Sequence, residues 1–324
     1  MKLGCSSWSY HAAIRSNRID LGEFLRIAGE DLEVDGVELA DLHFPNTDPA
    51  YLRQMKKRCV DLQLTLAGLA VSNDFGLPAR RGAERQSVQR WCDVAAYMGA
   101  PIVRVFAGWT PPPAPPRDNG RIVGFVRRIV GGSRLDSRRL WSDIAETLRL
   151  CADYAGGRGV TLALQNSRSD GIVASPLQLL QLVRDVGSPW LKVCLDPADF
   201  ADNTGIDAVL PETVQAHIRI REVADDGSDS RVAWPLLLQT MQLTHYRGFA
   251  LLDYEGIEDP EAAVPRATQH LRGLLHMLAR QRLLSETTSR VPEPPGEAAF
   301  AHPDLDARTV EDAISHVRSD AFVG

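Results

Sequence analysis

Residues 191–196 read LKVCLD, a short apolar run that ends on a carboxylate, Asp196. Similar short apolar runs recur along the chain, separated by amphipathic stretches. This alternation favours parallel strands connected by helices over an antiparallel sheet. The polar residues at the ends of five such runs are Glu38, Gln165, Asp196, His217, and Asp253 with Glu255.

About eight strand-and-helix units can be read from the sequence, which predicts an α/β fold, a single-domain (β/α)8 TIM barrel. The predicted strands are 2–7, 36–39, 64–71, 102–107, 161–165, 192–196, 216–220 and 249–254. The predicted helices lie near 21–32, 48–60, 82–99, 138–156, 176–186, 206–210, 234–244 and 260–283. Residues 1–284 are expected to form the barrel. Residues 285–324 form a proline-rich extension that is either partly disordered or packed on a neighbouring subunit.

Period-two alternation sorts the two faces of each strand. In the segment VTLALQN, Leu162 and Leu164 point to the helices, whereas Gln165 points into the barrel. The same parity directs Asp196 and His217 inward. Because the C-terminal ends of barrel strands meet at one mouth, we expect these polar side chains to share one site.

The composition of the chain further limits the classes of function that we expect. A chain of 324 residues with 44% hydrophobic content can bury a large core. A net charge of −6 without a long charged run argues against binding to nucleic acid. The five cysteines lack close pairing, and no leader-like or membrane-spanning run is present. We therefore expect a cytoplasmic protein without a membrane or nucleic-acid partner.

The loop 108–132, which contains WTPPPAPPRDNG, is too long for an ordinary link between a strand and a helix. Loops of this length are either functional or merely tolerated. Two interpretations stay open, a stiff lid over the mouth and a surface insertion.

Eight segments occur in a characteristic order, namely LGCSSWSYH, DGVELADLHFP, GLAVSNDF, GAPIVRVFAG, VTLALQN, VCLDPADF, AHIRI and YRGFALLDYEG. This order resembles the sugar phosphate isomerase/epimerase family, whose xylose isomerase-like barrel is shared with family 2 apurinic endonucleases. The segments span roughly residues 1 to 280. The resemblance implies a divalent metal (Mn²⁺, Mg²⁺ or Zn²⁺) held by Glu, Asp, His and Glu from strands five to eight. The corresponding residues here are Gln165, Asp196, His217 and Asp253, with Glu255 as the neighbouring option for the last position.

Two departures from the family pattern concern the metal. Gln165 stands where relatives carry Glu, and Asp253 shortens the last Glu. A hard cation prefers charged oxygen donors, and the Gln carbonyl offers only a dipole. We expect weakened metal binding, with Gln165 in a weak ligand position or hydrogen bonded to substrate.

The same departure concerns proton transfer. Epimerisation through opposite faces needs two acid/base groups, and Gln165 cannot exchange a proton. Glu255 is the first choice of base, and Glu38 is the second. If only one base remains, a reaction on one face such as β-elimination becomes attractive. Glu38 has an alternative structural role, a salt bridge to Arg104.

Ring side chains near the mouth suit a sugar or a flat ring system, although loop packing explains them equally well. They are Trp8, His43, Phe75 and Trp109. Arg104 and Arg219 point inward and either grip a carboxylate, phosphate or hydroxyl group of a substrate or neutralise the acidic mouth.

The sequence thus predicts a metal-dependent isomerase or epimerase that acts on a sugar or keto-sugar-like small molecule through an enediolate. A lyase that acts by β-elimination on an oxidised glycoside and a natural-product biosynthetic enzyme are the alternatives. A metal-dependent apurinic endonuclease lacks the histidines and the basic face that it would need, and a non-catalytic binding protein is the last option. Relatives are often dimers or tetramers, so a homo-oligomer is a further expectation.

Overall fold

The computed structural model describes residues 1–109, 133–167, 171–200, 203–229 and 231–289. The proline-rich part of the loop after Trp109 and the tail after Ser289 lie outside these residues, so the roles predicted for them stay predictions. The chain divides into two compact units, Met1–Leu278 and Ala279–Gly324. The first contains the barrel, and the described part of the second is the end of a helix.

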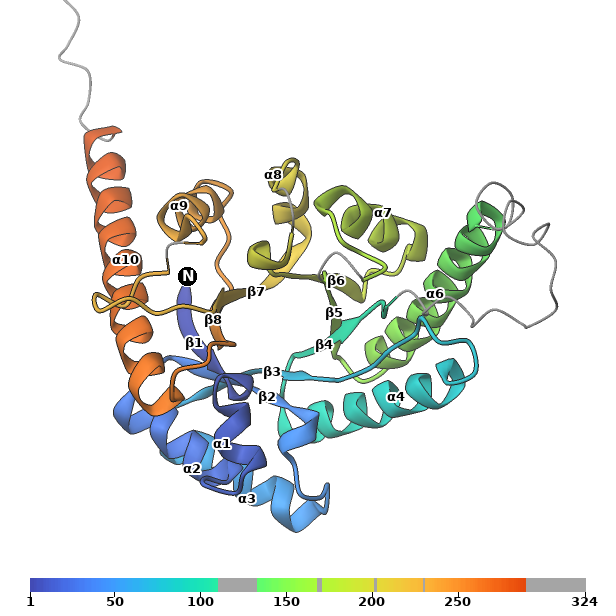
Figure 1. Cartoon of the computed structure of the whole chain (residues 1–324), viewed down its shortest axis with the longest axis horizontal. Coiled ribbons are helices and arrows are strands. Elements are labelled where there is room, and N and C mark those ends of the chain that lie inside the picture. Colours follow the sequence, from blue (N-terminus) through green and yellow to red (C-terminus); the bar gives the residue numbers. More distant parts are fainter. Residues whose placement is uncertain (110–132, 168–170, 201–202, 230, 290–324) are drawn as a thin grey trace, which may run out of the picture. The chain divides into compact units, whose positions relative to one another are not determined.

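Within the described residues, eight parallel strands in sequence order form a closed barrel (Figure 1). They are β1 (Lys2–Ser6), β2 (Gly36–Ala40), β3 (Thr65–Ala70), β4 (Ile102–Phe106), β5 (Thr161–Gln165), β6 (Leu191–Leu195), β7 (Thr213–Ile220) and β8 (Phe249–Tyr254). Pairing of Lys2 with Phe249 and of Cys5 with Leu252 joins β1 to β8 and closes the cylinder. The predicted TIM barrel is confirmed, and the main difference is that β7 begins at Thr213.

Helices connect the strands on the outside of the barrel (Figure 1). They are α1 (His11–Arg15), α2 (Leu21–Arg26), α3 (Pro49–Asp61), α4 (Arg81–Met98), α6 (Ser133–Gly156), α7 (Pro176–Val186), α8 (Ile206–Val209), α9 (Trp234–Leu243) and α10 (Pro260–Ser289). The helix predicted at 21–32 is split, because a π-helical turn at Ile27–Asp31 follows α2. None of the helices among the described residues has the length and apolarity needed to span a membrane.

Local sequence signals set the ends of α7. The Ser175 hydroxyl accepts a hydrogen bond from the backbone N–H of Gln178 and caps the first turn. Pro176 follows at the first helical position, where no intrahelical N–H is needed. Gly187 ends the helix with a φ of 65°, a left-handed conformation that glycine adopts without strain. The helix is therefore fixed between β5 and β6.

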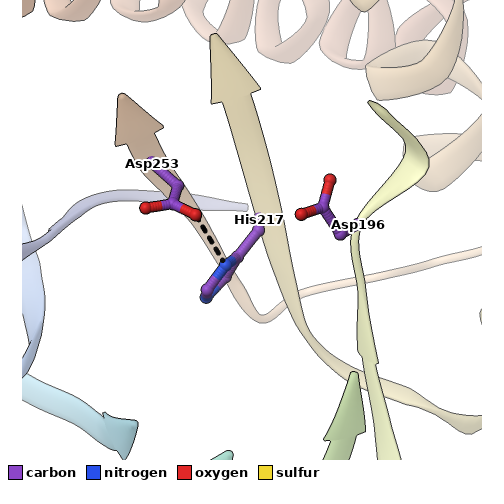
Figure 2. A group of neighbouring side chains, drawn as sticks. All are labelled: Asp196, His217 and Asp253. Atoms are coloured by element: carbon purple, nitrogen blue, oxygen red, sulfur yellow. Dashed lines mark ion pairs between the residues drawn. The ribbon is translucent and has the colours of Figure 1, made fainter. Parts of the chain in front are cut away.

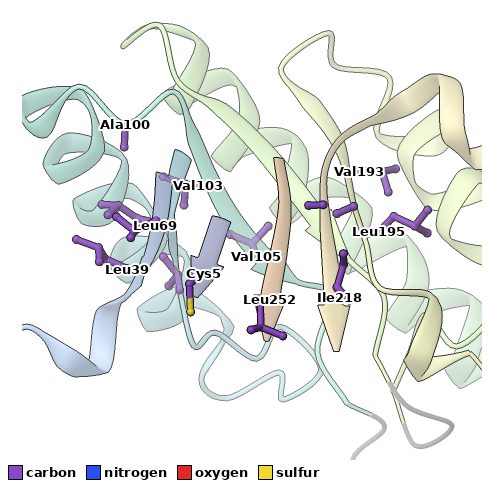
Figure 3. Packing of buried hydrophobic residues seen from close by; sticks show 14 of the residues in the cluster. Cys5, Leu39, Leu69, Ala100, Val103, Val105, Val193, Leu195, Ile218 and Leu252 are labelled. Carbon is purple, nitrogen blue, oxygen red and sulfur yellow. The ribbon is translucent and has the colours of Figure 1, made fainter. Parts of the chain in front are cut away.

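The core between strands and helices follows the predicted parity. Val103, Val105, Val193, Leu195 and Ile218 are all buried and belong to one hydrophobic cluster (Figure 3). The alternate strand residues are left for the barrel interior. All five cysteines are buried and free of disulfides.

Candidate active site

A cavity of about 510 Å³ lies at the mouth where the barrel strands end, the place where such barrels carry their chemistry. Its aromatic and cationic lining side chains are Trp8, Phe106, Trp109, Arg80, Arg104 and Arg219. Its lining carboxylates are Asp74, Glu84, Asp199, Asp253 and Glu255. The mouth is thus a polar pocket with aromatic walls.

Beside this pocket, Asp196, His217 and Asp253 each offer one ligand atom, and these atoms lie within 4.8 Å of one another (Figure 2). Asp196 directly follows β6, His217 lies within β7, and Asp253 is the penultimate residue of β8. All three side chains are buried. Strand parity therefore brings together the three side chains that the sequence placed in one site, and they form a possible cation site.

His217 lies between two carboxylates. Its Nε2 atom is 3.1 Å from Glu38 Oε2, and its Nδ1 atom is 3.4 Å from Asp253 Oδ2. Burial alone would lower the pKa of His217, but the neighbouring negative charges hold this pKa well above its ordinary value. Burial likewise opposes the charge of Glu38, whose pKa the imidazole keeps below the ordinary value. Glu38 and His217 therefore form a buried ion pair.

Arg219 is the central cation of the mouth. Its Nε atom is 2.8 Å from Asp196 Oδ2, and its Nη2 atom is 3.1 Å from Asp253 Oδ2. Its Nη1 atom lies 2.6 Å from Glu255 Oε1 and 3.4 Å from Asp199 Oδ2. Burial works against ionisation of Asp253, yet Arg219 lowers the pKa of this carboxyl below its usual range. The guanidinium on β7 therefore neutralises carboxylates at the ends of the two strands beside it, β6 and β8.

Asp196 is held by the end of β5. Asn166 Nδ2 donates to the Asp196 carbonyl at 2.8 Å, and the Asp196 N–H donates to Asn166 Oδ1 at 2.9 Å. Gln165 Nε2 donates to Asp196 Oδ2 at 3.1 Å. Burial raises the pKa of Asp196 to about 6, although Arg219 opposes the shift. Asn166 is a positioning residue that the sequence did not single out, although it directly follows Gln165.

The residues implied as metal ligands fit a divalent cation. Each keeps one buried atom without a hydrogen-bond partner among the described residues, and such atoms are costly unless a ligand satisfies them. These atoms are Gln165 Oε1, Asp196 Oδ1, His217 Nδ1 and Asp253 Oδ1. Binding has costs as well, because Arg219 already neutralises both aspartates and Nδ1 must give up its proton. The arrangement is a possible cation site in which binding competes with these existing interactions.

The structure separates the other expected residues into two groups. Trp8, Arg104, Trp109 and Arg219 line the pocket, together with Asp253 and Glu255. His43 and Phe75 are buried outside the lining, so the structure places neither at the substrate rim. Glu38 and Gln165 are also buried outside the lining. Glu38 pairs with His217 and accepts a hydrogen bond from Gln215, instead of forming the salt bridge to Arg104.

His43 supports the pocket wall from behind. Its Nδ1 atom is 2.8 Å from Ser7 Oγ, and its Nε2 atom is 2.9 Å from His11 Nδ1. The His11 ring stacks on Trp8 with 4.0 Å between ring centroids. Burial lowers the pKa of His43 to about 4, so the ring is neutral at pH 7. His43 therefore positions Trp8 through His11.

Three lining carboxylates were missed in the sequence, Asp74, Glu84 and Asp199. Asp74 Oδ1 accepts hydrogen bonds from the N–H groups of Gly76 and Trp109, and so joins the loops after β3 and β4. Asp199 lies in the 3-10 turn Pro197–Asp199 and receives Arg221 Nη2 at 2.6 Å. Asp74 and Asp199 follow a strand end, at Asn73-Asp74 and in DPAD, which is the signal that could have identified them, whereas Glu84 lies in the first turn of α4.

Comparison with known proteins shows which family shares this fold. The sequence pattern of the xylose isomerase-like TIM barrel family matches residues 28–274. No curated protein sequence matches the chain.

Solved structures with a similar fold include several sugar epimerases. L-Ribulose 3-epimerase aligns with a TM-score of 0.67 and 16% identity over 90% of this chain and 99% of that chain. D-Psicose 3-epimerase from Clostridium cellulolyticum H10 with D-tagatose aligns with a TM-score of 0.65 and 14% identity over 86% and 99% of the two chains. 3-Keto-D-glucoside 4-epimerase from E. coli aligns with a TM-score of 0.62 and 16% identity over 85% and 99%. At these identities the likeness shows the fold, and the family match shows that this chain belongs to the xylose isomerase-like TIM barrel family.

Proposed function

We propose that this chain isomerises or epimerises a sugar or keto-sugar-like small molecule by proton transfer next to a carbonyl. One observation carries the proposal. The carboxylate of Glu255 lines the pocket of about 510 Å³, 2.6 Å from the Arg219 guanidinium and beside the possible cation site. The sugar epimerases with the same fold support this reaction class.

Glu255 is the proposed base. Its side chain is 19% exposed and lies in the pocket wall, where it can reach a bound substrate. Arg219 holds one of its oxygens, and Arg221 Nη2 lies 3.6 Å from the other. These contacts fix the direction of the carboxylate, which proton abstraction requires. The rings of Trp8 and Trp109 offer apolar faces to the sugar.

The cation, where present, would be held by Asp196, His217 and Asp253, with Gln165 Oε1 as an uncharged fourth donor. A bound divalent metal supplies Lewis-acid polarisation of a substrate carbonyl. Arg219 lies in the same pocket wall and also stabilises negative charge that develops on a substrate oxygen. Metal dependence is thus part of the proposal, with Arg219 as a permanent cation beside it.

A lyase is the second candidate, and the position of Glu38 favours it. Glu38 is fully buried, is paired with His217 and lies outside the pocket lining. Gln165 cannot exchange protons. Glu255 is therefore the proposed base on one face only, which suits 1,2-isomerisation on one face or β-elimination better than proton transfer between two faces.

The experiment is a substrate panel of ketoses and 3-keto-glycosides, incubated with the protein in deuterated buffer with and without added Mn²⁺. Proton NMR reports loss of the signal next to the carbonyl, and product analysis separates isomerisation from elimination. Deuterium incorporation supports enolisation. Absence of exchange across the whole panel, with metal present, would end this proposal.

A further inference from the structure

Arg104 is a buried cation that makes no direct ion pair with a carboxylate among the described residues, although its charge helps to lower the pKa of Glu38 and of Asp253. The residue is 6% exposed and lines the pocket. Among the described residues, its hydrogen bond runs from Nη1 to the Val71 carbonyl at 3.5 Å, the long limit for such a bond. The buried Nε atom has no hydrogen-bond partner in the same part of the chain. The guanidinium carbon lies 4.4 Å from the centre of the Phe106 ring, a contact that offsets only part of the cost of burying the charge.

The other two arginines of the pocket lining are paired. Arg80 Nη2 lies 2.7 Å from Glu84 Oε1, and Arg219 contacts carboxylates through all three of its nitrogen atoms. Asp74, the acidic residue after β3, is engaged with the N–H groups of Gly76 and Trp109. The lining carboxylates therefore already have partners at direct contact, and Arg104 makes no such contact with a carboxylate among the described residues.

The barrel also makes room for this side chain. Arg104 on β4 is in register with Ala70 on β3 and with Ala163 on β5. Two small neighbours leave the long side chain free to extend into the mouth. A buried arginine held there without a direct ion pair is typical of a site that an anionic ligand completes.

We propose that the substrate carries a carboxylate group and that Arg104 binds it. This inference rests on the proposed function, because it describes the substrate of the same pocket. A guanidinium edge matches a carboxylate through two parallel hydrogen bonds, and the free Nε atom belongs to such an edge. Phosphate sites usually add several backbone N–H groups or a helix N-terminus, and the contacts of Arg104 include neither. A sugar acid would place its carboxylate at Arg104 on β4 and its reacting carbon near Glu255 after β8.

The first test measures binding without turnover. Methyl β-D-glucuronide and methyl β-D-glucoside differ at one carbon, and neither has a free carbonyl to enolise. Isothermal titration of each into wild-type protein, Arg104→Gln and Arg80→Gln compares the two sugars. Arg80 is the matched control because it also lines the pocket but is 66% exposed and paired with Glu84. Methyl β-D-glucoside 6-phosphate, which also lacks a free carbonyl, is the third ligand and separates carboxylate from phosphate recognition.

The expected result is that wild type and Arg80→Gln bind the glucuronide at least about tenfold more tightly than the glucoside. Arg104→Gln is expected to lose this preference. Equal affinity for the two sugars, no measurable binding of the glucuronide, or a preference that survives in Arg104→Gln would overturn the inference. Tighter binding of the sugar phosphate than of the glucuronide would overturn the assignment to carboxylate. None of these outcomes depends on turnover, so they leave the proposed reaction to its own test.

A second measurement uses stability. Arg104→Met removes the guanidinium but keeps a long side chain, so the stabilisation that a ligand gives can be compared between this variant and wild type. Addition of the glucuronide should raise the unfolding temperature of wild type and leave that of Arg104→Met unchanged. An equal rise of the unfolding temperature in both proteins would contradict the inference.

Discussion

Arg219 Nε donates a 2.8 Å hydrogen bond to Asp196 Oδ2, whereas Oδ1 of the same carboxylate has no hydrogen-bond partner among the described residues. The two carboxylate oxygens of Asp253 differ in the same way. Oδ2 lies 3.1 Å from Arg219 Nη2, and Oδ1 has no hydrogen-bond partner among the described residues. Each aspartate thus gives one oxygen to an internal cation and keeps one for another ligand. Arg219 and a divalent metal would share the negative charge of the same two carboxylates.

Replacement of Arg219 by Gln should strengthen metal binding. The substitution removes a positive charge from the two aspartates, so Mn²⁺ should bind more tightly than to wild type in calorimetric titration. The metal-free variant should lose about 3 to 5 kcal/mol of unfolding free energy, because the buried carboxylates lose their partner. Mn²⁺ should restore part of this loss.

Arg231→Gln is the control for this substitution, since Arg231 is 53% exposed and pairs with Glu222 at the surface. It should leave both metal affinity and stability unchanged. Weaker Mn²⁺ binding in Arg219→Gln than in wild type would show that the guanidinium helps to build the cation site.

Replacement of Gln165 by Glu should also strengthen metal binding, because it adds a charged donor next to Asp196. Gln165 Nε2 is 3.1 Å from Asp196 Oδ2, and its Oε1 atom is buried without a hydrogen bond. The expected gain in Mn²⁺ affinity is about tenfold or more, equal to about 1.4 kcal/mol. Unchanged affinity in the same titration would place Gln165 outside the ligand shell.

His43 should make the protein less stable in acid. Its pKa is about 4 in the folded chain and 6.5 ordinarily, so the unfolded chain binds the proton first as pH falls. Stability should be unaffected above the ordinary pKa, then decrease through this window by up to about 3 kcal/mol. Urea unfolding of wild type and His43→Asn at about pH 7 and about pH 4.5 measures the effect.

Asn is chosen in this variant because its side-chain carbonyl can still accept a hydrogen bond from Ser7 Oγ, as His43 Nδ1 can. His43→Asn should show a smaller loss of stability between the two pH values than wild type. An identical loss in both proteins would mean that other groups cause the acid sensitivity.

The fold could be predicted from the sequence because each strand and helix carries its own periodicity. The parity of Leu164 and Gln165 at the end of β5, for example, needs only the local segment. The contacts at the mouth could not be predicted in this way. These contacts depend on how segments far apart in sequence pack. Examples are the choice of carboxylates that Arg219 binds and the position of His43 behind Trp8.

The central claim is proton abstraction next to a carbonyl by Glu255, and deuterium exchange in Glu255→Gln tests it most directly. Glu258→Gln is the matched control, since Glu258 is 42% exposed and pairs with Arg266. With the best substrate of the panel, Glu255→Gln should exchange about 10² to 10⁴ times more slowly than wild type, while Glu258→Gln exchanges at the wild-type rate. Exchange by Glu255→Gln at the wild-type rate would contradict the account.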